Sequence, residues 1–253
     1  MTGTTSDITE QGGRKVVLVT GATSGIGEGI TRRLAAEGHH VVAGARREDR
    51  LADLAESLRA DGGSIDVRRL DVTDRDDMAR FVDETVTARG HIDVMVGNAG
   101  VMPLSRLDAL LVDEWDRMVD VNIKGLLHGI AAAMPHFQRQ QSGHFVTIAS
   151  VGAYSVVPTA AVYCATKYAA WAITEGLRQE AEPFIRVTTV SPGVVESELA
   201  DTITDPGAAA AMKAYRAAAI PPDAIARAIS YAISQPADVD VNELVIRPAR
   251  QRP

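Results

Sequence analysis

The sequence contains very little cysteine and no long apolar run. Its 253 residues include a single cysteine, Cys164, so no disulfide can form within the chain, and proteins that depend on disulfides belong to oxidising compartments. No stretch approaches the ~20 apolar residues that a membrane-spanning helix needs. These two scarcities exclude a disulfide scaffold and a membrane-spanning protein. We therefore expect a cytoplasmic protein with no membrane partner.

Basic residues are also scarce relative to acidic ones. The chain has 26 Lys and Arg against 33 Asp and Glu, which gives a formal net charge of -7, whereas a nucleic-acid binder normally carries a basic face. The histidines, among them His39 and His40, lack the spacing of metal ligands. The sequence thus predicts no nucleic-acid partner and no bound metal.

The chain does show a regular alternation of short apolar runs and longer amphipathic stretches. The predicted strands cover residues 16–19, 40–44, 65–70, 92–96, 144–149, 185–190 and 244–246. The predicted helices cover residues 25–37, 48–60, 74–89, 112–137, 160–182 and 222–234. Strands that are apolar throughout indicate a parallel sheet buried on both faces. The pattern predicts an α/β protein: a single-domain, doubly wound Rossmann fold with a mostly parallel, seven-stranded sheet flanked by helices on both faces.

Two segments lie outside this pattern. Residues 1–13 are polar and rich in Gly and Thr, and we expect a flexible lead-in there, followed by one domain over residues 14–253. Residues 199–222 are rich in Ala, Gly and Thr and show no regular period. A loop of that length in a compact domain is more often functional than a mere connection, so we expect a lid over a substrate site.

The turn after the first predicted strand is rich in glycine. It reads TGATSGIG from Thr20 to Gly27. Glycines at such a place allow a tight turn and let the backbone approach a pyrophosphate, and the following helix N-terminus offers free N–H groups to the phosphates. A plain strand-to-helix turn is the alternative, but the position between the first strand and the first helix favours a dinucleotide site. The expected cofactor contacts in this turn are Gly21, Thr23, Ser24, Gly25, Ile26 and Gly27.

The end of the second predicted strand indicates which dinucleotide binds. Enzymes that prefer NAD place an acidic residue there for the ribose 2′-hydroxyl, whereas NADP enzymes supply an arginine for the 2′-phosphate. Here Ala45 takes the acidic position, and Arg46 and Arg47 follow it. A guanidinium binds a phosphate through paired hydrogen bonds, and a carboxylate would repel it. Solvated loop charges are the alternative interpretation, but we expect NADP(H), bound in part by Arg46 and Arg47.

A tyrosine and a lysine lie four residues apart in a predicted helix. Tyr163 and Lys167 therefore share one helix face, and a nearby ammonium favours the phenolate form of a tyrosine. Such a pair occurs by chance in many helices. Ser150 supports it, because this residue ends the fifth strand, where its hydroxyl can bond a substrate oxygen. We expect Tyr163 to transfer the proton in a carbonyl–alcohol reaction.

Asn122 is a further candidate. It lies inside a predicted helix, where asparagine is unfavourable, among apolar neighbours such as Met118 and Leu126. A surface asparagine is the alternative. The predicted catalytic residues are Asn122, Ser150, Tyr163 and Lys167.

The spacing T-G-x-x-x-G-x-G resembles the short-chain dehydrogenase/reductase family, and later segments resemble it in the same order. Ser150 precedes Tyr163 by thirteen positions, as in that family. Residues 97–100 read GNAG, similar to the family's N-N-A-G but with Gly97 in place of the first Asn. Residues 192–197 read PGVVES, similar to its P-G-x-V-x-T. The resemblance implies an oxidoreductase that interconverts a carbonyl (ketone or aldehyde) and an alcohol by hydride transfer with NADP(H).

The resemblance also implies individual roles. Asp71 and Val72 would face the adenine, the Val195 backbone would pair with the nicotinamide carboxamide, and Asn122 would hold a water in a proton relay to Lys167. The further cofactor contacts that it implies are Asp71, Val72, Asn98, Ala99, Gly100, Tyr163, Lys167, Pro192, Gly193, Val195 and Ser197.

The substrate is a small molecule whose identity the sequence leaves open. The predicted pocket is largely apolar and contains Met102, Val151, Tyr154 and Val194. The end of the chain resembles a subgroup that contains bacterial serine/3-hydroxy acid dehydrogenases and a clavulanic aldehyde reductase. One alternative is therefore a 3-hydroxy acid whose carboxylate meets Lys213 or Arg216, although both residues also fit as solvated lid charges.

A catalytically silent NADP(H)-binding regulator is the other alternative. Such a protein should lack Tyr163, Lys167 or Ser150, and all three are present. Finally, the predicted helical regions 110–134 and 160–177 are too hydrophobic for one buried face each. Exposed apolar surface of this kind usually means association, so we expect a homotetramer, with a homodimer as the alternative.

Overall fold

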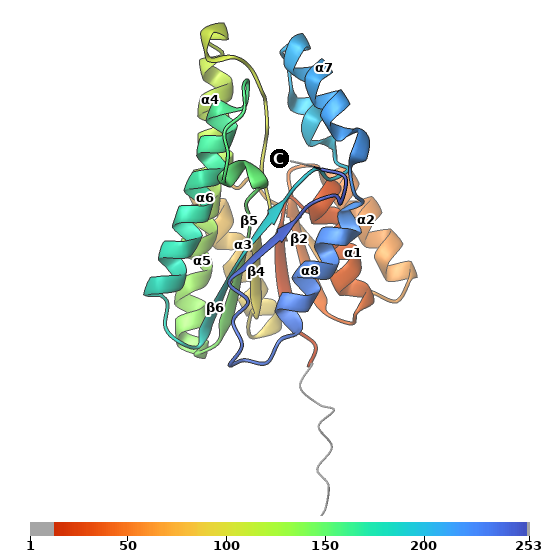
Figure 1. Ribbon diagram of the computed structural model, residues 1–253. Helices are drawn as coiled ribbons and strands as arrows, with labels where there is room; N and C mark the ends of the chain where they lie inside the picture. The colour runs from red at the N-terminus through yellow and green to blue at the C-terminus, as the bar shows by residue number, and fades with distance from the viewer. Residues whose placement is uncertain (1–12, 252–253) are drawn as a thin grey trace, which may run out of the picture.

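Seven strands form one sheet in the computed structural model, which describes residues 13–251 (Figure 1). They are β1 (Val16–Thr20), β2 (His40–Ala45), β3 (Ser64–Arg69), β4 (Val94–Gly97), β5 (Gly143–Ile148), β6 (Ile185–Pro192) and β7 (Glu243–Ile246). Their order is β3-β2-β1-β4-β5-β6-β7, and every neighbouring pair is parallel. The predicted Rossmann-like α/β fold is confirmed, with a sheet that is parallel throughout.

Helices cover both faces of the sheet. They are α1 (Gly25–Ala36), α2 (Glu48–Ala60), α3 (Arg75–Arg89), α4 (Val112–Val119), α5 (Gly125–Gln140), α6 (Ala161–Glu180), α7 (Pro206–Tyr215) and α8 (Pro222–Ser234). Figure 1 shows α1, α2 and α8 on one side of the sheet and α3, α5 and α6 on the other. In none of the helices within residues 13–251 is there a stretch long and apolar enough to cross a membrane.

Strand β1 shows why the sheet needs two helical layers. Its side chains alternate between the faces: Val17 and Val19 enter the core under α1, α2 and α8. Val16 and Leu18 enter the core under α3 and α5. All five residues of the strand are buried. A strand with no polar face is stable only when both faces are covered, which is the condition that its sequence implied.

The predicted long helix over residues 112–137 is not continuous. Helix α4 ends at Val119, a π-helical turn follows over Asp120–Lys124 (η2), and α5 begins at Gly125. A π turn inserts an extra residue into an α-helix and often marks a functional site. Asn122 lies in this turn and is only 4% exposed, so the asparagine that is unfavourable in an α-helix coincides with the irregularity.

The predicted lid contains more regular structure than its sequence indicated. Helix α7 lies inside it, with 3₁₀ turns on either side at Glu198–Thr202 (η4) and Arg216–Ala218 (η5). The absence of a regular period was therefore misleading here, because a run of alanines has high helix propensity without any amphipathic pattern. Residues 1–12 of the predicted lead-in lie outside the described residues.

Candidate active site

A cleft of about 790 Å³ lies at the carboxyl ends of the strands, the edge at which doubly wound sheets bind ligands. It brings together residues that are far apart in the chain, from Gly21 to Gln251. The predicted site residues that line it are Gly21, Thr23, Ser24, Gly25, Ile26, Arg46, Arg47, Asp71, Val72, Asn98, Ala99, Gly100, Met102, Ser150, Val151, Tyr163, Lys167, Pro192, Gly193, Val194, Val195 and Ser197. Within the described chain, three predicted residues lie off this lining: Gly27, Asn122 and Tyr154.

The turn after β1 requires glycine at two positions. Gly21 has φ +66, and a Cβ there would lie 2.9 Å from the Ala99 Cα. Gly25 has φ +52, and a Cβ there would lie 2.8 Å from the Ser197 Cβ. Residues that carry a side chain rarely adopt this left-handed backbone conformation. The bare backbone therefore keeps this end of the cleft open, as a pyrophosphate cradle needs.

Helix α1 presents its N-terminus to the cleft. Its N-cap residue, Ser24, makes no side-chain cap hydrogen bond within the described structure, and Ser24, Gly25 and Ile26 all line the cleft. The first N–H groups of a helix have no partner inside the helix and carry the positive end of its dipole. They suit an anion such as a phosphate. Gly27 follows them, at a position where an added Cβ would collide with the Gly21 carbonyl oxygen.

The ends of β2 and β3 supply charged side chains at the same end of the cleft. Arg46 is exposed on the lining, next to the buried Ala45. Arg47 donates a hydrogen bond to Glu198 (2.9 Å) and another to the Thr23 hydroxyl (3.3 Å). Arg50 donates a second one to Glu198 (2.5 Å). Of the two predicted arginines, Arg47 is thus engaged with the lid, and Arg46 is the one left facing the cleft.

Asp71 is held in its charged form. Burial alone would raise the pKa of its carboxyl group, but two hydrogen bonds from Thr73 and the charges of Arg46 and Arg69 lower it. Asp71 does not cap the following helix: the N-cap of α3 is Asp74, whose carboxylate accepts from the Asp76 and Asp77 N–H groups. Asp71 lines the cleft, and its contact with an adenine stays a prediction.

Asn98 fixes the turn at the end of β4. Its side-chain amide donates to the carbonyls of Thr20 (2.8 Å) and Gly21 (3.2 Å), and its backbone N–H donates to the Thr20 hydroxyl. Gly97 stands where the resembled family has another Asn. A Cβ at Gly97 would lie 3.1 Å from the Leu126 Cδ1, so leucine occupies the space of that side chain. Asn98 and the Ala99 N–H, which donates to the Thr20 hydroxyl (3.1 Å), tie this turn to β1.

The Ser150, Tyr163 and Lys167 side chains converge in the middle of the cleft. Ser150 follows β5 and caps the 3₁₀ turn Val151–Ala153 (η3), accepting a hydrogen bond from the Gly152 N–H (3.0 Å). The Lys167 Nζ donates to the Ile148 carbonyl (2.8 Å) and lies 6.0 Å from the centre of the Tyr163 ring. The four-residue spacing on α6 thus places both groups on the face that looks into the cleft.

Burial dominates the protonation of this pair. Burial raises the pKa of Tyr163 to about 12, although the hydrogen bond with Ser150 acts in the opposite direction. Burial lowers the pKa of Lys167 to about 8. The sequence suggested that the ammonium would favour the phenolate, but desolvation acts on both charged forms more strongly. Near neutral pH the structure therefore holds a phenol beside an ammonium.

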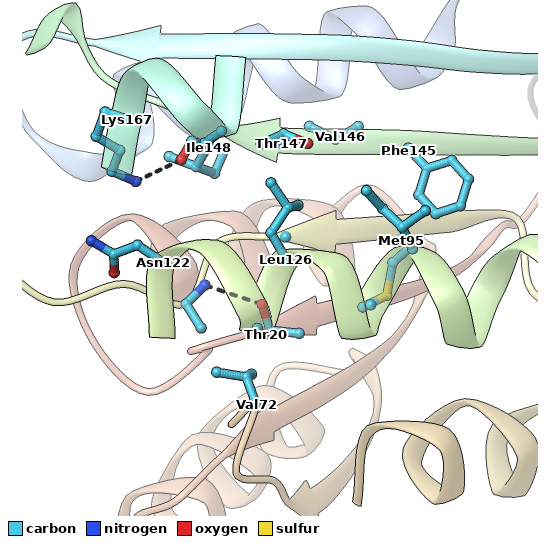
Figure 2. A pocket seen from close by; sticks show the side chains of 16 residues that line it. Thr20, Val72, Met95, Asn122, Leu126, Phe145, Val146, Thr147, Ile148 and Lys167 are labelled. Carbon is cyan, nitrogen blue, oxygen red and sulfur yellow. Dashed lines mark hydrogen bonds between the residues drawn. The ribbon is translucent and has the colours of Figure 1, made fainter. Parts of the chain in front are cut away.

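Asn122 lies behind the cleft rather than on it. Its side-chain oxygen accepts from the Val101 N–H (2.8 Å), and its amide donates to the Val101 carbonyl and the Thr166 hydroxyl (both 3.0 Å). It shares a small internal cavity of about 20 Å³ with Lys167 and Thr20. Figure 2 shows Lys167 and Asn122 at the same end of this cavity. A space of that size holds about one water molecule.

The other end of the cleft is lined by residues of the predicted lid and of the C-terminal tail, and the sequence indicated only the former. Gln251 accepts a hydrogen bond from the Val194 N–H (3.0 Å) and donates one to the Tyr215 hydroxyl (2.5 Å). The tail residues Arg247 and Gln251 both line the cleft. No local sequence pattern could have found them, because their place depends on contacts with β6 and α7.

The two lid cations proposed for a carboxylate have different surroundings. Arg216 lines the cleft and donates to the backbone carbonyls of Val195 (3.3 Å) and Ser197 (2.5 Å). Lys213 is exposed and is absent from the lining of the cleft as far as the chain is described. Tyr154 also points elsewhere: its hydroxyl bonds the Ser191 hydroxyl (2.7 Å) and the Glu243 carboxylate.

Comparisons with known proteins agree with this geometry. The family model for short chain dehydrogenases matches residues 15–207. An uncharacterized oxidoreductase of Staphylococcus saprophyticus is 47% identical over 240 residues, which are 94% of this chain and 97% of that protein. The fold is similar to a Thermococcus sibiricus alcohol dehydrogenase solved with 5-hydroxy-NADP (TM-score 0.85, 31% identity, 95% and 99% of the two chains). It is also similar to the closed form of a serine dehydrogenase complexed with NADP+ (TM-score 0.86, 31% identity, 94% and 96%).

Proposed function

Because the chain belongs to the short chain dehydrogenase family and is an oxidoreductase of that family, we propose that it reduces a small ketone or aldehyde to an alcohol, reversibly, with NADP(H). The observation that carries this proposal is the pairing of Tyr163 with Ser150 and Lys167 on the wall of the cleft. A protonated phenol and a serine hydroxyl there can both meet the oxygen of a bound carbonyl.

The cofactor end fits a dinucleotide. The Gly21–Gly25 turn and the open N-terminus of α1 would hold the pyrophosphate, Asp71 and Val72 would face the adenine, and Val195 would hold the carboxamide of the nicotinamide. When bound, the nicotinamide ring supplies the hydride in reduction and accepts it in oxidation. Arg46 would bind the 2′-phosphate, since it faces the cleft beside Ala45, which has no carboxylate to repel that group.

We assign the proton transfer to Tyr163. Its raised pKa keeps the hydroxyl protonated, so in reduction the phenol gives its proton to the oxygen of the substrate, while the Ser150 hydroxyl bonds the same oxygen. The Lys167 ammonium stabilises the tyrosinate that remains. A water in the cavity between Asn122 and Lys167 would then return a proton from that side.

Two further parts of the proposal concern the domain and its assembly. We propose that residues 199–222 act as a lid over the substrate end of one catalytic domain (14–253) in a cytoplasmic enzyme. We also propose a homotetramer, with a homodimer as the alternative, because Leu127 on α5 is 44% exposed and Tyr168 on α6 is 39% exposed. Equilibrium sedimentation at the mass of one chain, 26.9 kDa, would contradict either assembly.

Oxidation of NADPH over a panel of aldehydes, ketones, β-keto esters and hydroxy acids tests the proposed function. We expect turnover with NADPH on several carbonyls, and a loss of about 10²–10⁴-fold in kcat for Tyr163→Phe with little change in NADPH affinity. A panel that gives no turnover while NADP+ still binds would instead support a catalytically silent regulator.

A 3-hydroxy acid is the second candidate substrate, and one residue favours it. Arg247 lines the cleft beside Gly193, and within residues 13–251 no hydrogen bond or ion pair engages its guanidinium. It fits a substrate carboxylate better than Lys213 or Arg216 do. We expect Arg247→Ala to raise KM about tenfold or more for a hydroxy acid and to leave neutral alcohols unchanged. Lys213→Ala is the matched control. If Arg247→Ala affected hydroxy acids and neutral alcohols equally, Arg247 would not bind a substrate carboxylate.

A further inference from the structure

Glu243 accepts hydrogen bonds from two distant parts of the chain. It is the first residue of β7, the edge strand of the sheet. One of its carboxylate oxygens, Oε1, accepts a hydrogen bond from the Trp171 Nε1–H (3.1 Å) and another from the Tyr154 hydroxyl. The Tyr154 hydroxyl also bonds the Ser191 Oγ (2.7 Å). One carboxylate therefore connects α6, the segment after η3, and β6.

Each of these segments carries part of the proposed active site. Trp171 lies on α6 four residues after Lys167, which is one helical turn further on the same face. Tyr154 comes directly after η3, four residues after Ser150. The network thus joins the helix that holds Tyr163 to the turn that holds Ser150, through side chains that do not line the cleft in the described structure.

We propose that Glu243 and Tyr154 are positioning residues, which fix the Ser150 turn against the helix that carries Tyr163 and Lys167. The inference rests on the proposed function of that site. Neither residue touches the cleft in the described structure, so both act through others.

The orientation of the turn explains how this positioning works. Val151, Gly152 and Ser155 line the cleft, whereas the Tyr154 side chain points to the edge of the sheet and is bonded there at its tip. Because the Tyr154 side chain is fixed at the edge of the sheet, the neighbouring residues of the same turn remain directed toward the cleft. Burial and the hydrogen bond to Glu243 raise the pKa of Tyr154 to about 12, so the phenol remains a hydrogen-bond donor over the working pH range of most enzymes.

The position of Ser150 matters because its hydroxyl must meet the same substrate oxygen as Tyr163. A displacement of about 1 Å in a catalytic group can cost on the order of 10²-fold in rate. The network is at the surface, and several other contacts hold the turn, including the bond from the Gly152 N–H to the Ser150 Oγ. We therefore expect kcat to fall by about tenfold when the network is broken, which is less than the loss of about 10²-fold for a fully displaced group.

Four variants of the full-length enzyme test the inference: Glu243→Ala, Glu243→Gln, Tyr154→Phe and the double variant Glu243→Ala/Tyr154→Phe. We expect Glu243→Ala and Tyr154→Phe each to lower kcat about tenfold with an unchanged dissociation constant for NADPH. Glu243→Gln should restore activity, because the amide keeps an acceptor oxygen at that position. The loss in the double variant should be smaller than the two single losses combined, since both variants remove the hydrogen bond between Tyr154 and Glu243. Tyr231→Phe is the matched control: that tyrosine is on α8 and is 55% exposed.

Amide hydrogen exchange of residues 150–157 provides a readout that does not depend on turnover. Faster exchange there in Glu243→Ala and Tyr154→Phe, restored in Glu243→Gln, would support the inference even if the substrate panel showed no activity and the proposed function failed. An active wild-type enzyme with unchanged kcat and unchanged exchange in Tyr154→Phe would overturn it. That variant loses a single hydroxyl group, so it keeps the test decisive if Glu243→Ala does not fold. A lowered melting temperature with unchanged kcat would also overturn it, because the network would then be structural only.

Discussion

The two ends of the cleft are built in different ways. At the end proposed for the cofactor, the Gly21–Gly25 turn, Arg46 and Asp71 each begin within two residues of the end of a strand, so the sheet itself sets their positions. At the end proposed for the substrate, the wall includes residues of η3, of the segment 198–216 and of the C-terminal tail. The tail is joined to that segment by side-chain hydrogen bonds such as those of Gln251. The first end has its shape from backbone geometry, and the second depends on contacts between segments far apart in the chain.

This difference suits the two ligands that the cleft would hold. A dinucleotide is the same for every relative that uses it, and a rigid backbone cradle serves it without adjustment. A substrate varies, and loops on a rigid scaffold can change without harm to the fold. Tyr163 and Lys167, on α6, also line this cleft.

The largest effect should come from Lys167, between the two ends. Replacing it with methionine should lower kcat by about 10²-fold or more, because the tyrosinate loses its ammonium. The same change should raise the free energy of unfolding at pH 7, because methionine avoids the cost of burying the ammonium. Burial lowers the pKa of Lys167 from 10.5 to about 8, which corresponds to about 3 kcal/mol. Steady-state kinetics and urea unfolding at pH 7 measure both.

The pH dependence of the wild-type protein's stability tests the same explanation, the burial of Lys167. Between about pH 8 and 10.5 the unfolded chain still binds the Lys167 proton, whereas the folded chain has released it, so the contribution of this residue makes the protein more stable as the pH rises. The Lys167→Met variant should lack that gain. Lys213→Met, at an exposed position, is the control and should behave like wild type. A Lys167→Met variant that is less stable than wild type at pH 7 would contradict this account.

A smaller effect should come from the cofactor end. Arg46→Ala should reduce the preference for NADPH over NADH by about ten- to a hundredfold in kcat/KM, because hydrogen bonds to a charged phosphate contribute about 1.5–3 kcal/mol. The kcat with saturating NADPH should change little. Arg75→Ala serves as the control, since Arg75 is exposed on α3 outside the cleft. A preference for NADH in the wild-type enzyme would remove the role of Arg46 altogether.

The smallest effect should come from the base of the lid. Glu198 pairs with Arg47 and Arg50, but all three side chains are more than two-fifths exposed, at 45%, 41% and 42%. Exposed ion pairs contribute about 0–1 kcal/mol. Glu198→Gln should therefore speed amide hydrogen exchange of the lid by no more than about fivefold, with kcat unchanged. Glu56→Gln on α2 is the control, and a tenfold change in kcat would mean that the lid is held more tightly than these pairs allow.

The sequence predicted the fold and the turn after β1 closely, for a physical reason. Strand periodicity and the glycines of a turn are local properties, so the seven strands and the Gly21–Gly25 cradle could be located without knowledge of the tertiary structure. The substrate end was predicted less well. Tyr154 was expected in the pocket, but the turn η3 directs it to Glu243, which is 89 residues away in the chain.

The irregular elements were missed for a similar reason. The π turn at Asn122 and the helix α7 in the lid both break the expected patterns, the first by interrupting a regular helix and the second by forming one without an amphipathic period. Asn122 gave a signal, since an asparagine inside an apolar helix needs partners, and Val101 and Thr166 supply them. The C-terminal tail gave none.

The sequence by itself determined that Tyr163, Lys167 and Ser150 belong together, because the order and spacing of the motifs are written in the chain. The protonation of that group was decided only by the tertiary structure. A lysine four residues from a tyrosine suggests a lowered tyrosine pKa, yet burial raises the pKa of Tyr163 and lowers that of Lys167. Desolvation depends on everything packed around a side chain, and that surrounding exists only after the sheet, the helix and the turn have come together.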